Sequence, residues 1–327
     1  MKNKTWIISF FLIVFIIFVG RKGIVHYRLQ YTFESSQMYD RGHWLKEKNL
    51  YPQIVFLGSS MIKYSIIPNI IVKNSNLTKG SVVNLGADAA TPYEMYLTYI
   101  KNKKHFSKTK IFFYSIEPWL FSMKYYQYKV YEKVLWSKEE WKYYMPQWDY
   151  HSKYKTSLFD VIKKFKYVKP KIINYGYIPK LHSEKKFKLA TKQEIQTYFQ
   201  DTVHNDLGIS HFQLKYLKKL KDEIEKNHSK FVILYIPNHI SYTQAINTYN
   251  KNYNLTLSNL LNEYLDKTKQ FGSFCSKDYN LKYEDYFDRF HLSNTGAIKY
   301  SNYLGNILQL SNDFNDTKVL IDYSCKD

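Results

Sequence analysis

The chain has 327 residues, a formal net charge of +20 at pH 7 and two cysteines. This length is enough for one large α/β domain with an insertion, or for two small domains. The charge comes without a zinc-finger spacing, a helix-turn-helix signature or an RNP-type motif, so we predict no nucleic-acid partner. Cys275 and Cys325 lack the spacing of a metal site, and we predict neither a metal nor a cofactor. The sequence leaves open whether these cysteines are free or paired.

Residues 6–20 form an apolar run that is interrupted only by Ser9 and flanked by basic residues. As a helix the run spans about 22 Å, which is short of a hydrocarbon core of ~30 Å unless the bilayer thins or flanking residues snorkel. It is either a membrane anchor or a signal peptide. We favour an uncleaved anchor over residues 1–22, since no small-x-small cleavage site follows the run. A juxtamembrane linker with some helix should follow over residues 23–50.

The apolar residues 54–57 are followed at once by Gly58, Ser59 and Ser60. Four large apolar residues in a row are typical of a strand buried on both faces, and the glycine permits a sharp turn. The serines should therefore lie at the carboxyl end of a strand, where open α/β sheets bind ligands. Ser60 is a candidate nucleophile, although such a turn also serves as plain strand-to-helix punctuation.

Two further buried strands are predicted in the first third of the chain. The first, over residues 81–86, ends at Gly86, and we expect its backbone N–H at the same edge of the sheet as Ser60. A helix over residues 91–102 should follow, with a threonine cap and a proline in its first turn. The next strand, over residues 111–114, leads to Glu117. We favour a lysine-paired carboxylate at Glu117 over a direct part in catalysis.

Residues 120–210 contain no strand-like apolar run and are rich in tyrosine, tryptophan and lysine. We predict a largely helical insertion over the edge of the sheet. It either covers apolar surface or, through aromatic residues such as Trp136 and Trp141, forms a platform for an anionic polymer or lipid headgroup.

Helix and strand alternate again in the last third of the chain. A helix over residues 214–226 and a strand over residues 231–236 form one crossover of a parallel sheet, and the strand ends at Asn238 and His239. The remaining predicted elements are a helix over residues 256–269, a short strand over 271–275, a helix over 293–308 and a loosely attached tail over 311–327.

Asp288 and His291 lie three residues apart, just before the last predicted helix. This spacing lets the carboxylate hold one imidazole nitrogen while the other nitrogen faces outward. The alternative is a solvated pair at a helix N-terminus. His239 is a competing base, but it has no acidic neighbour in the sequence, so we rank it below His291.

These motifs, in this order, resemble the SGNH (GDSL-like) hydrolase superfamily. The resemblance rests on the Gly-Ser-Ser turn, the Asn-Leu-Gly turn at residues 84–86 and the Asp-Arg-Phe-His sequence at residues 288–291, and it covers roughly residues 50–120 and 230–310. The Glu-Pro-Trp sequence at Glu117 and the N-terminal apolar segment resemble the membrane-anchored DltD-type branch, which acts in teichoic-acid D-alanyl transfer and cell-envelope O-acylation. The Gly-x-Asn block of most members is missing here.

The predicted fold is a three-layer α/β domain over residues 51–310, SGNH/flavodoxin-like, with a mostly parallel sheet of about five strands. The resemblance implies a catalytic triad of Ser60, Asp288 and His291. It also implies that the backbone N–H groups of Ser60 and Gly86 hold the oxyanion. We also predict that Glu117 and Asn238 lie at the edge of this site.

The function implied by this resemblance is that of a serine esterase or O-acyltransferase, anchored in the membrane and acting outside the cytoplasm on O-acyl groups. Its partners would be a cell-envelope polysaccharide or teichoic-acid-like polymer and a multispanning membrane acyltransferase. The alternative is a non-catalytic, membrane-anchored binding or assembly protein on an SGNH scaffold.

Overall fold

The computed structural model describes residues 9, 10, 12, 37–122, 177, 208–266, 268–310, 316, 317 and 325. The chain divides into residues 1–36 with 128–168 and residues 37–127 with 169–327, and all elements named below belong to the second unit. The α-helices are α2 (Gln37–Glu47), α3 (Ser60–Ser65), α4 (Pro68–Asn74), α5 (Pro92–Asn102), α11 (His211–Lys226), α12 (Ile240–Tyr249), α13 (Lys251–Leu265) and α14 (Asn294–Leu310). Short 3-10 helices are η1 (Lys103–Phe106), η2 (Pro118–Phe121), η5 (Ser276–Tyr279) and η6 (Tyr283–Asp285). The strands are β1 (Ile54–Leu57), β2 (Val82–Asn84), β3 (Ile111–Ser115), β4 (Lys230–Tyr235), β5 (Thr268–Gly272) and β6 (Asp316–Thr317).

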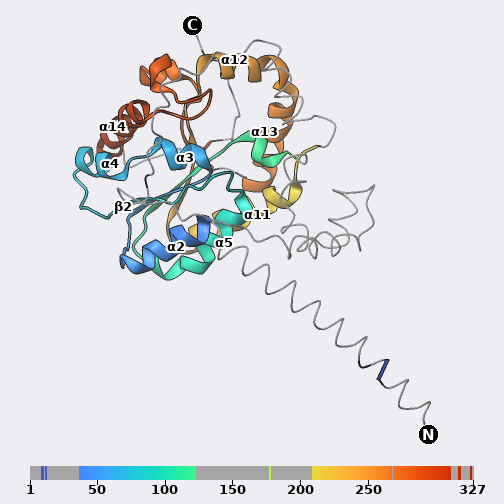
Figure 1. The fold of residues 1–327 in the computed structure, drawn as a ribbon. Helices are drawn as coiled ribbons and strands as arrows, with labels where there is room; N and C mark the ends of the chain where they lie inside the picture. The colour runs from blue at the N-terminus through green and yellow to red at the C-terminus, as the bar shows by residue number, and fades with distance from the viewer. Residues whose placement is uncertain are drawn as a thin grey trace. The chain divides into compact units, whose positions relative to one another are not determined.

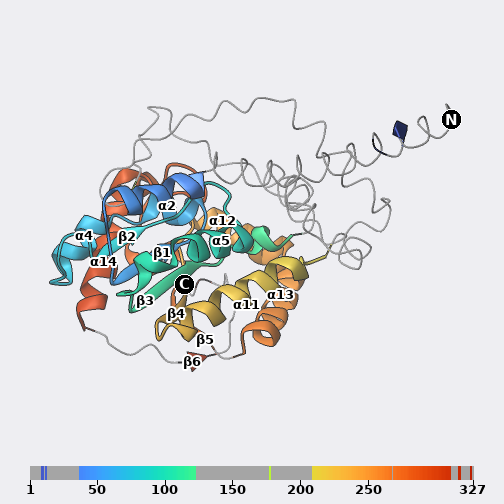
Figure 2. The same cartoon turned by 90° about the horizontal axis from the view of Figure 1, so that it is seen from below.

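Five parallel strands form the sheet in the order β2-β1-β3-β4-β5, and β6 adds an antiparallel edge (Figure 2). This is the flavodoxin-like strand order. Phe56 of β1 pairs with Asn84 of β2 on one side and with Phe113 of β3 on the other. The prediction of an α/β domain with a mostly parallel sheet of about five strands is confirmed. The carboxyl ends of β1, β2 and β3 therefore meet at one edge.

Helices cover both faces of this sheet (Figure 1). On one face, Phe56 and Phe113 stack with ring centroids 4.9 Å apart and belong to a core cluster that includes residues of α3, α4 and α14. On the other face, Phe112 contacts the ring of Tyr99 in α5, which packs against α11. Side chains alternate between the two faces along each strand, which explains why β1 and the interiors of β3 and β4 are apolar.

The last third of the chain departs from the predicted elements. The predicted strand over residues 271–275 is misplaced, because β5 already begins at Thr268, within the predicted helix over 256–269. The side chains of β5 are half-buried and mostly polar, because β5 lies near the edge of the sheet. For this reason its sequence contains no apolar run from which the strand could be predicted. The helix α12 is an element that we did not predict.

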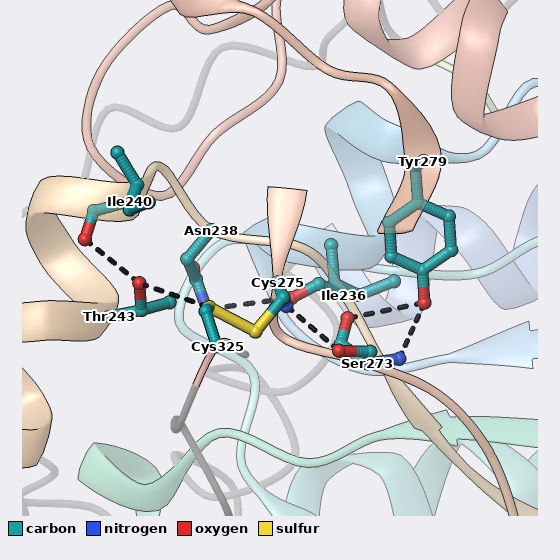
Figure 3. Close-up of a disulfide and its surroundings, with 8 residues drawn as sticks. All are labelled: Ile236, Asn238, Ile240, Thr243, Ser273, Cys275, Tyr279 and Cys325. Atoms are coloured by element: carbon teal, nitrogen blue, oxygen red, sulfur yellow. Dashed lines mark hydrogen bonds between the residues drawn. A yellow bond between two sulfur atoms is a disulfide. The ribbon is translucent and has the colours of Figure 1, made fainter. Parts of the chain in front are cut away.

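The tail is attached more firmly than predicted. Cys325 forms a disulfide with Cys275, with the two Cα atoms 5.5 Å apart (Figure 3). In addition, β6 pairs with β5 through Thr317 and Thr268. The prediction of a loosely attached tail is therefore wrong at these positions, and the cysteines are paired.

Two predicted segments lie largely outside the described residues. The anchor over residues 1–22 is described only at positions 9, 10 and 12, and no helix in the described ranges is long and apolar enough to cross a membrane. Of the insertion over residues 120–210, the structure describes 120–122, 177 and 208–210. Trp136 and Trp141 are outside these ranges. The two ends of the insertion meet, since Ser122 and Ile209 form an antiparallel bridge.

Candidate active site

The turn after β1 fixes the position of Ser60. Gly58 has φ +148°, and a Cβ atom there would clash with the Oγ of Ser115 on β3. Ser59 is the N-cap of α3 and accepts a hydrogen bond from the backbone N–H of Met61 at 3.1 Å. Ser60 is then the first residue of α3, at the carboxyl edge of the sheet.

A short closed loop between η6 and α14 carries Asp288 and His291. The loop is held by an antiparallel bridge between Tyr286 and Leu292 and by a hydrogen bond from Phe287 N–H to His291 O of 2.8 Å. The Oδ1 atom of Asp288 accepts from the backbone N–H of His291 at 2.8 Å. This Asx-type turn places the Asp288 carboxylate next to the His291 imidazole through local contacts alone.

The three predicted catalytic side chains meet at this edge of the sheet. His291 Nδ1 lies 2.7 Å from Asp288 Oδ2, and His291 Nε2 lies 2.8 Å from Ser60 Oγ. Because an ionised carboxylate only accepts hydrogen bonds, Nδ1 carries the proton and Nε2 presents a lone pair to the serine hydroxyl. Ser60 and His291 are 9% and 8% exposed, so the pair is shielded but open to a substrate. This is the arrangement that activates a serine nucleophile.

Two aromatic rings hold the His291 imidazole in place. Tyr64 meets it edge-on with centroids 5.4 Å apart, and the Phe290 ring lies 4.5 Å away. Burial, aided by the nearby Asp88 carboxylate, raises the pKa of Tyr64 above its ordinary value. Tyr64 therefore stays a neutral phenol and serves as a wall of the site.

Glu117 lies beneath the nucleophile turn and is only 5% exposed. It accepts hydrogen bonds from the hydroxyls of Ser59 at 2.5 Å and Ser115 at 3.0 Å. Burial raises the pKa of its carboxyl to about 7, against the opposing effect of these two hydrogen bonds. The predicted pairing with a lysine is wrong, because in the described part of the chain serine hydroxyls, not a cation, contact this carboxyl.

The predicted oxyanion donors differ in their surroundings. The Gly86 N–H donates to Asn84 Oδ1 at 2.9 Å, and Gly86 packs against the backbone of Lys63 in α3. This geometry does not match the role predicted for Gly86, since its N–H already has an acceptor on the sheet side. The Ser60 N–H has no acceptor within the described residues, and it remains available to an oxyanion.

Asn84 is a residue whose importance we did not predict. Its Nδ2 atom donates to the carbonyl oxygens of Ile62 and Ile66 at 2.8 Å each, so it ties β2 to the helix that begins with Ser60. A signal was present in the sequence, because a buried strand that ends in a polar residue must find a partner for it. Ser115, at the end of β3, gives the same signal.

A search with protein-family models and a search of curated proteins find no match for this chain. Among solved structures, one similar chain is a Streptococcus pneumonia protein described provisionally as a platelet activating factor, with 14% identity, a TM-score of 0.39, and coverage of 83% of this chain and 91% of that chain. Another is a Desulfitobacterium hafniense DCB-2 protein described provisionally as a lipolytic protein of the G-D-S-L family. It has 9% identity and a TM-score of 0.34, and the match covers 78% of this chain and 98% of that chain. We therefore base the function on the geometry of the site.

A narrow crevice of only about 10 Å³, which is room for about one water molecule, lies beside the catalytic pair. Its lining includes Met61 and Phe290, the sequence neighbours of Ser60 and His291. Both predicted edge residues, Glu117 and Asn238, also line it, and the remaining walls are Ile116, Trp119, Ile236, Tyr242 and Phe274. The walls of this crevice are mostly apolar, but its volume is too small to hold an acyl chain.

The competing histidine has a different position. His239 is the N-cap of α12, and its Nδ1 atom lies 2.8 Å from the Ser241 hydroxyl. Burial lowers the pKa of His239. Because its ring nitrogen is used to begin a helix, and Ser60 Oγ is already bonded to His291, the structure favours His291 as the base.

Proposed function

We propose that this chain is a serine esterase or O-acyltransferase of the SGNH type. The observation that carries the proposal is the continuous contact from Ser60 Oγ through His291 to Asp288, with steps of 2.8 and 2.7 Å. These are hydrogen-bond distances between a nucleophile, its base and the group that orients the base.

In the proposed reaction, His291 Nε2 takes the hydroxyl proton of Ser60 as Oγ attacks the carbonyl carbon of an ester or thioester. Asp288 stabilises the imidazolium, and the Ser60 N–H stabilises the oxyanion. The bond to the leaving group then breaks, and that group takes the proton from His291. A water molecule or a polymer hydroxyl, deprotonated by His291, next attacks the carbonyl carbon of the acyl-enzyme; the bond to Ser60 Oγ breaks, and Oγ takes the proton back from His291.

We further propose that residues 1–22 anchor the chain in the membrane, with the domain outside the cytoplasm. The acceptor would be a cell-envelope polysaccharide or a teichoic-acid-like polymer, and a multispanning membrane acyltransferase would supply the acyl group. The support for this part is the resemblance of the motifs to the DltD-type branch, including the Glu-Pro-Trp sequence that begins at Glu117.

One observation favours the alternative of a non-catalytic binding or assembly protein. The Gly86 N–H is bonded to Asn84, so a single backbone N–H, that of Ser60, is left among the named oxyanion donors. An oxyanion with one donor is stabilised less than one with two or three.

A fluorophosphonate probe on the detergent-solubilised full chain separates these functions. We expect covalent labelling that is lost in Ser60→Ala and kept in Ser107→Ala, which changes an exposed serine. Labelling that persists in Ser60→Ala would show that another residue is the nucleophile, and no labelling of a folded chain would favour the non-catalytic alternative.

A further inference from the structure

A basic groove lies at the end of the sheet opposite to Ser60. It has a volume of about 450 Å³ and is lined by the residues that precede β1, β2 and β3, namely Gln53, Ser81 and Lys110, and by the loops before them. Gln53 is seven positions before Ser60, so the groove and the nucleophile are roughly 20 Å apart if the chain is extended. The groove is therefore separate from the candidate active site.

Three lysines give this groove its charge. Lys79, Lys108 and Lys110 line it, all three are exposed, and no acidic residue lines it. No ion pair joins any of them to an acidic side chain in the described part of the chain. Like charges that share a concave surface repel one another, and a bound anion relieves this repulsion.

An aromatic ring stands beside these cations. Tyr51 is 41% exposed, and the Nζ atom of Lys108 lies 5.7 Å from the centre of its ring. The ring also lies beside His105, with centroids 5.4 Å apart, and His105 Nδ1 lies 3.2 Å from Leu50 O. An exposed ring held in this way offers a flat apolar surface next to positive charge, which suits the carbon face of a sugar or polyol that also carries an anion.

Neutral polar groups complete the lining. Gln53 and Thr78 line the groove, and their side-chain types, an amide and a hydroxyl, are able to hydrogen-bond the hydroxyl groups of a ligand. The backbone N–H groups of Lys79 and Gly80 have no acceptor within the described residues, and Gly80 takes a left-handed conformation with φ +85°. Turns of this kind present backbone N–H groups to anions.

We propose that this groove binds one phosphate-bearing polyol or sugar unit of an anionic polymer. The concave shape, the aromatic ring and the hydroxyl-binding groups favour a single polymer unit over a flat lipid surface, although a glycerol-phosphate headgroup shares part of this chemistry. A long polymer held here as well as at Ser60 binds at two places, which raises its apparent affinity. This inference goes beyond the proposed acyl transfer, since binding at the groove does not require the triad.

The test uses the detergent-solubilised full chain and a synthetic poly(glycerol phosphate), with neutral dextran as a reference. We expect the triple variant Lys79→Gln/Lys108→Gln/Lys110→Gln to bind the polymer at least tenfold more weakly. The matched control Lys215→Gln/Lys219→Gln/Lys251→Gln removes the same charge from three exposed lysines on α11 and α13 and should stay within twofold. Ser60→Ala should bind like the unchanged chain, so the result is independent of catalysis.

Two further measurements test whether the bound ligand is the polymer or a lipid and whether the variants remain folded. Tyr51→Leu should weaken binding of the polymer but not of inorganic phosphate, because only the polymer has a carbon face to stack. Both groove variants should retain the melting temperature of the parent within a few degrees. If both triple lysine variants lost polymer affinity equally, the loss would come from net charge alone, and the proposal would be overturned. Loss confined to micelles that contain phosphatidylglycerol would also overturn it, in favour of a lipid site.

Discussion

The hydroxyl of Ser59 donates a hydrogen bond to Glu117 Oε2 across 58 positions of sequence. Ser59 also caps the helix whose first residue is Ser60. A buried carboxyl on the β3 side therefore supports the turn that presents the nucleophile, and its second oxygen is held by Ser115. The protonation of Glu117 should accordingly affect the stability of the turn.

We predict that Glu117 makes the folded chain less stable as pH rises from about 4.5 to about 7. Its carboxyl releases a proton near 4.5 at its ordinary pKa but near 7 in the folded chain. Between these values the folded state binds more protons than the unfolded state, so the free energy of unfolding falls with pH and then levels off. The whole decrease is on the order of 3 kcal/mol.

Glu117→Gln should remove this decrease, since an amide does not titrate. The measurement is thermal unfolding of the two chains at pH 4.5, 5.5, 6.5 and 7.5, with the exposed Glu263→Gln as the control. Parallel pH profiles for the parent and Glu117→Gln would contradict the prediction.

The core of the fold could be predicted because its strands are buried on both faces. The apolar runs at residues 54–57 and 231–236 and the helix cap at Thr91 can each be recognised locally, and the structure contains the corresponding elements, including a full capping box at Thr91. By contrast, β5 lies near the edge of the sheet and is half-exposed, so its polar sequence gave no such signal.

The candidate site was predictable to the extent that its motifs are local. Asp288 and His291 belong to one turn, and Ser60 follows a recognisable strand. The contact between Ser59 and Glu117 was not predictable, because it depends on the register of β1 against β3. Likewise, no sequence rule told us that Asn84 would fold back onto Gly86 and take its N–H.

The two histidines at the carboxyl edge should respond differently to the same substitution. His291→Asn removes the base, and we expect hydrolysis of a small activated ester to fall about a thousandfold or more. His239→Asn keeps a good N-cap for α12, so activity should change little, although loss of the buried ring that packs on Tyr283 and Tyr286 should lower the melting temperature. If His239→Asn abolished ester hydrolysis and His291→Asn did not, the assignment of the base would be reversed.

The disulfide should stabilise the chain by about 4 kcal/mol, the value that the loop-entropy relation gives for a sequence separation of 50 residues. We therefore expect dithiothreitol to lower the melting temperature of the parent. Cys275→Ser/Cys325→Ser should show the lower melting temperature without reductant and no further response to it. Two titratable thiols in the unreduced, unfolded parent would show instead that the cysteines are free.

Asn84 provides the sharpest test of how the nucleophile is positioned. Asn84→Ala removes the donor to Ile62 O and Ile66 O and the acceptor of the Gly86 N–H; Ile62 O keeps its bond from the Ile66 N–H, but Ile66 O and the Gly86 N–H lose their buried partner. We expect kcat for a small ester to fall by tenfold or more with a smaller change in KM, because α3 and Ser60 lose their fixed geometry.

The same variant also tests the oxyanion assignment, because it frees the Gly86 N–H. The matched control is Asn74→Ala, which removes the hydrogen bonds from Asn74 in α4 to Asn302 in α14; in the described part of the chain these bonds involve no residue of α3 or β2. If the Gly86 N–H were aimed at the oxyanion, its release from Asn84 would raise kcat, and the Ser60 N–H would then not act alone. A fall in kcat for Asn84→Ala, with kcat unchanged in Asn74→Ala, would show that Asn84 holds α3 in place and that this positioning outweighs any donor gained.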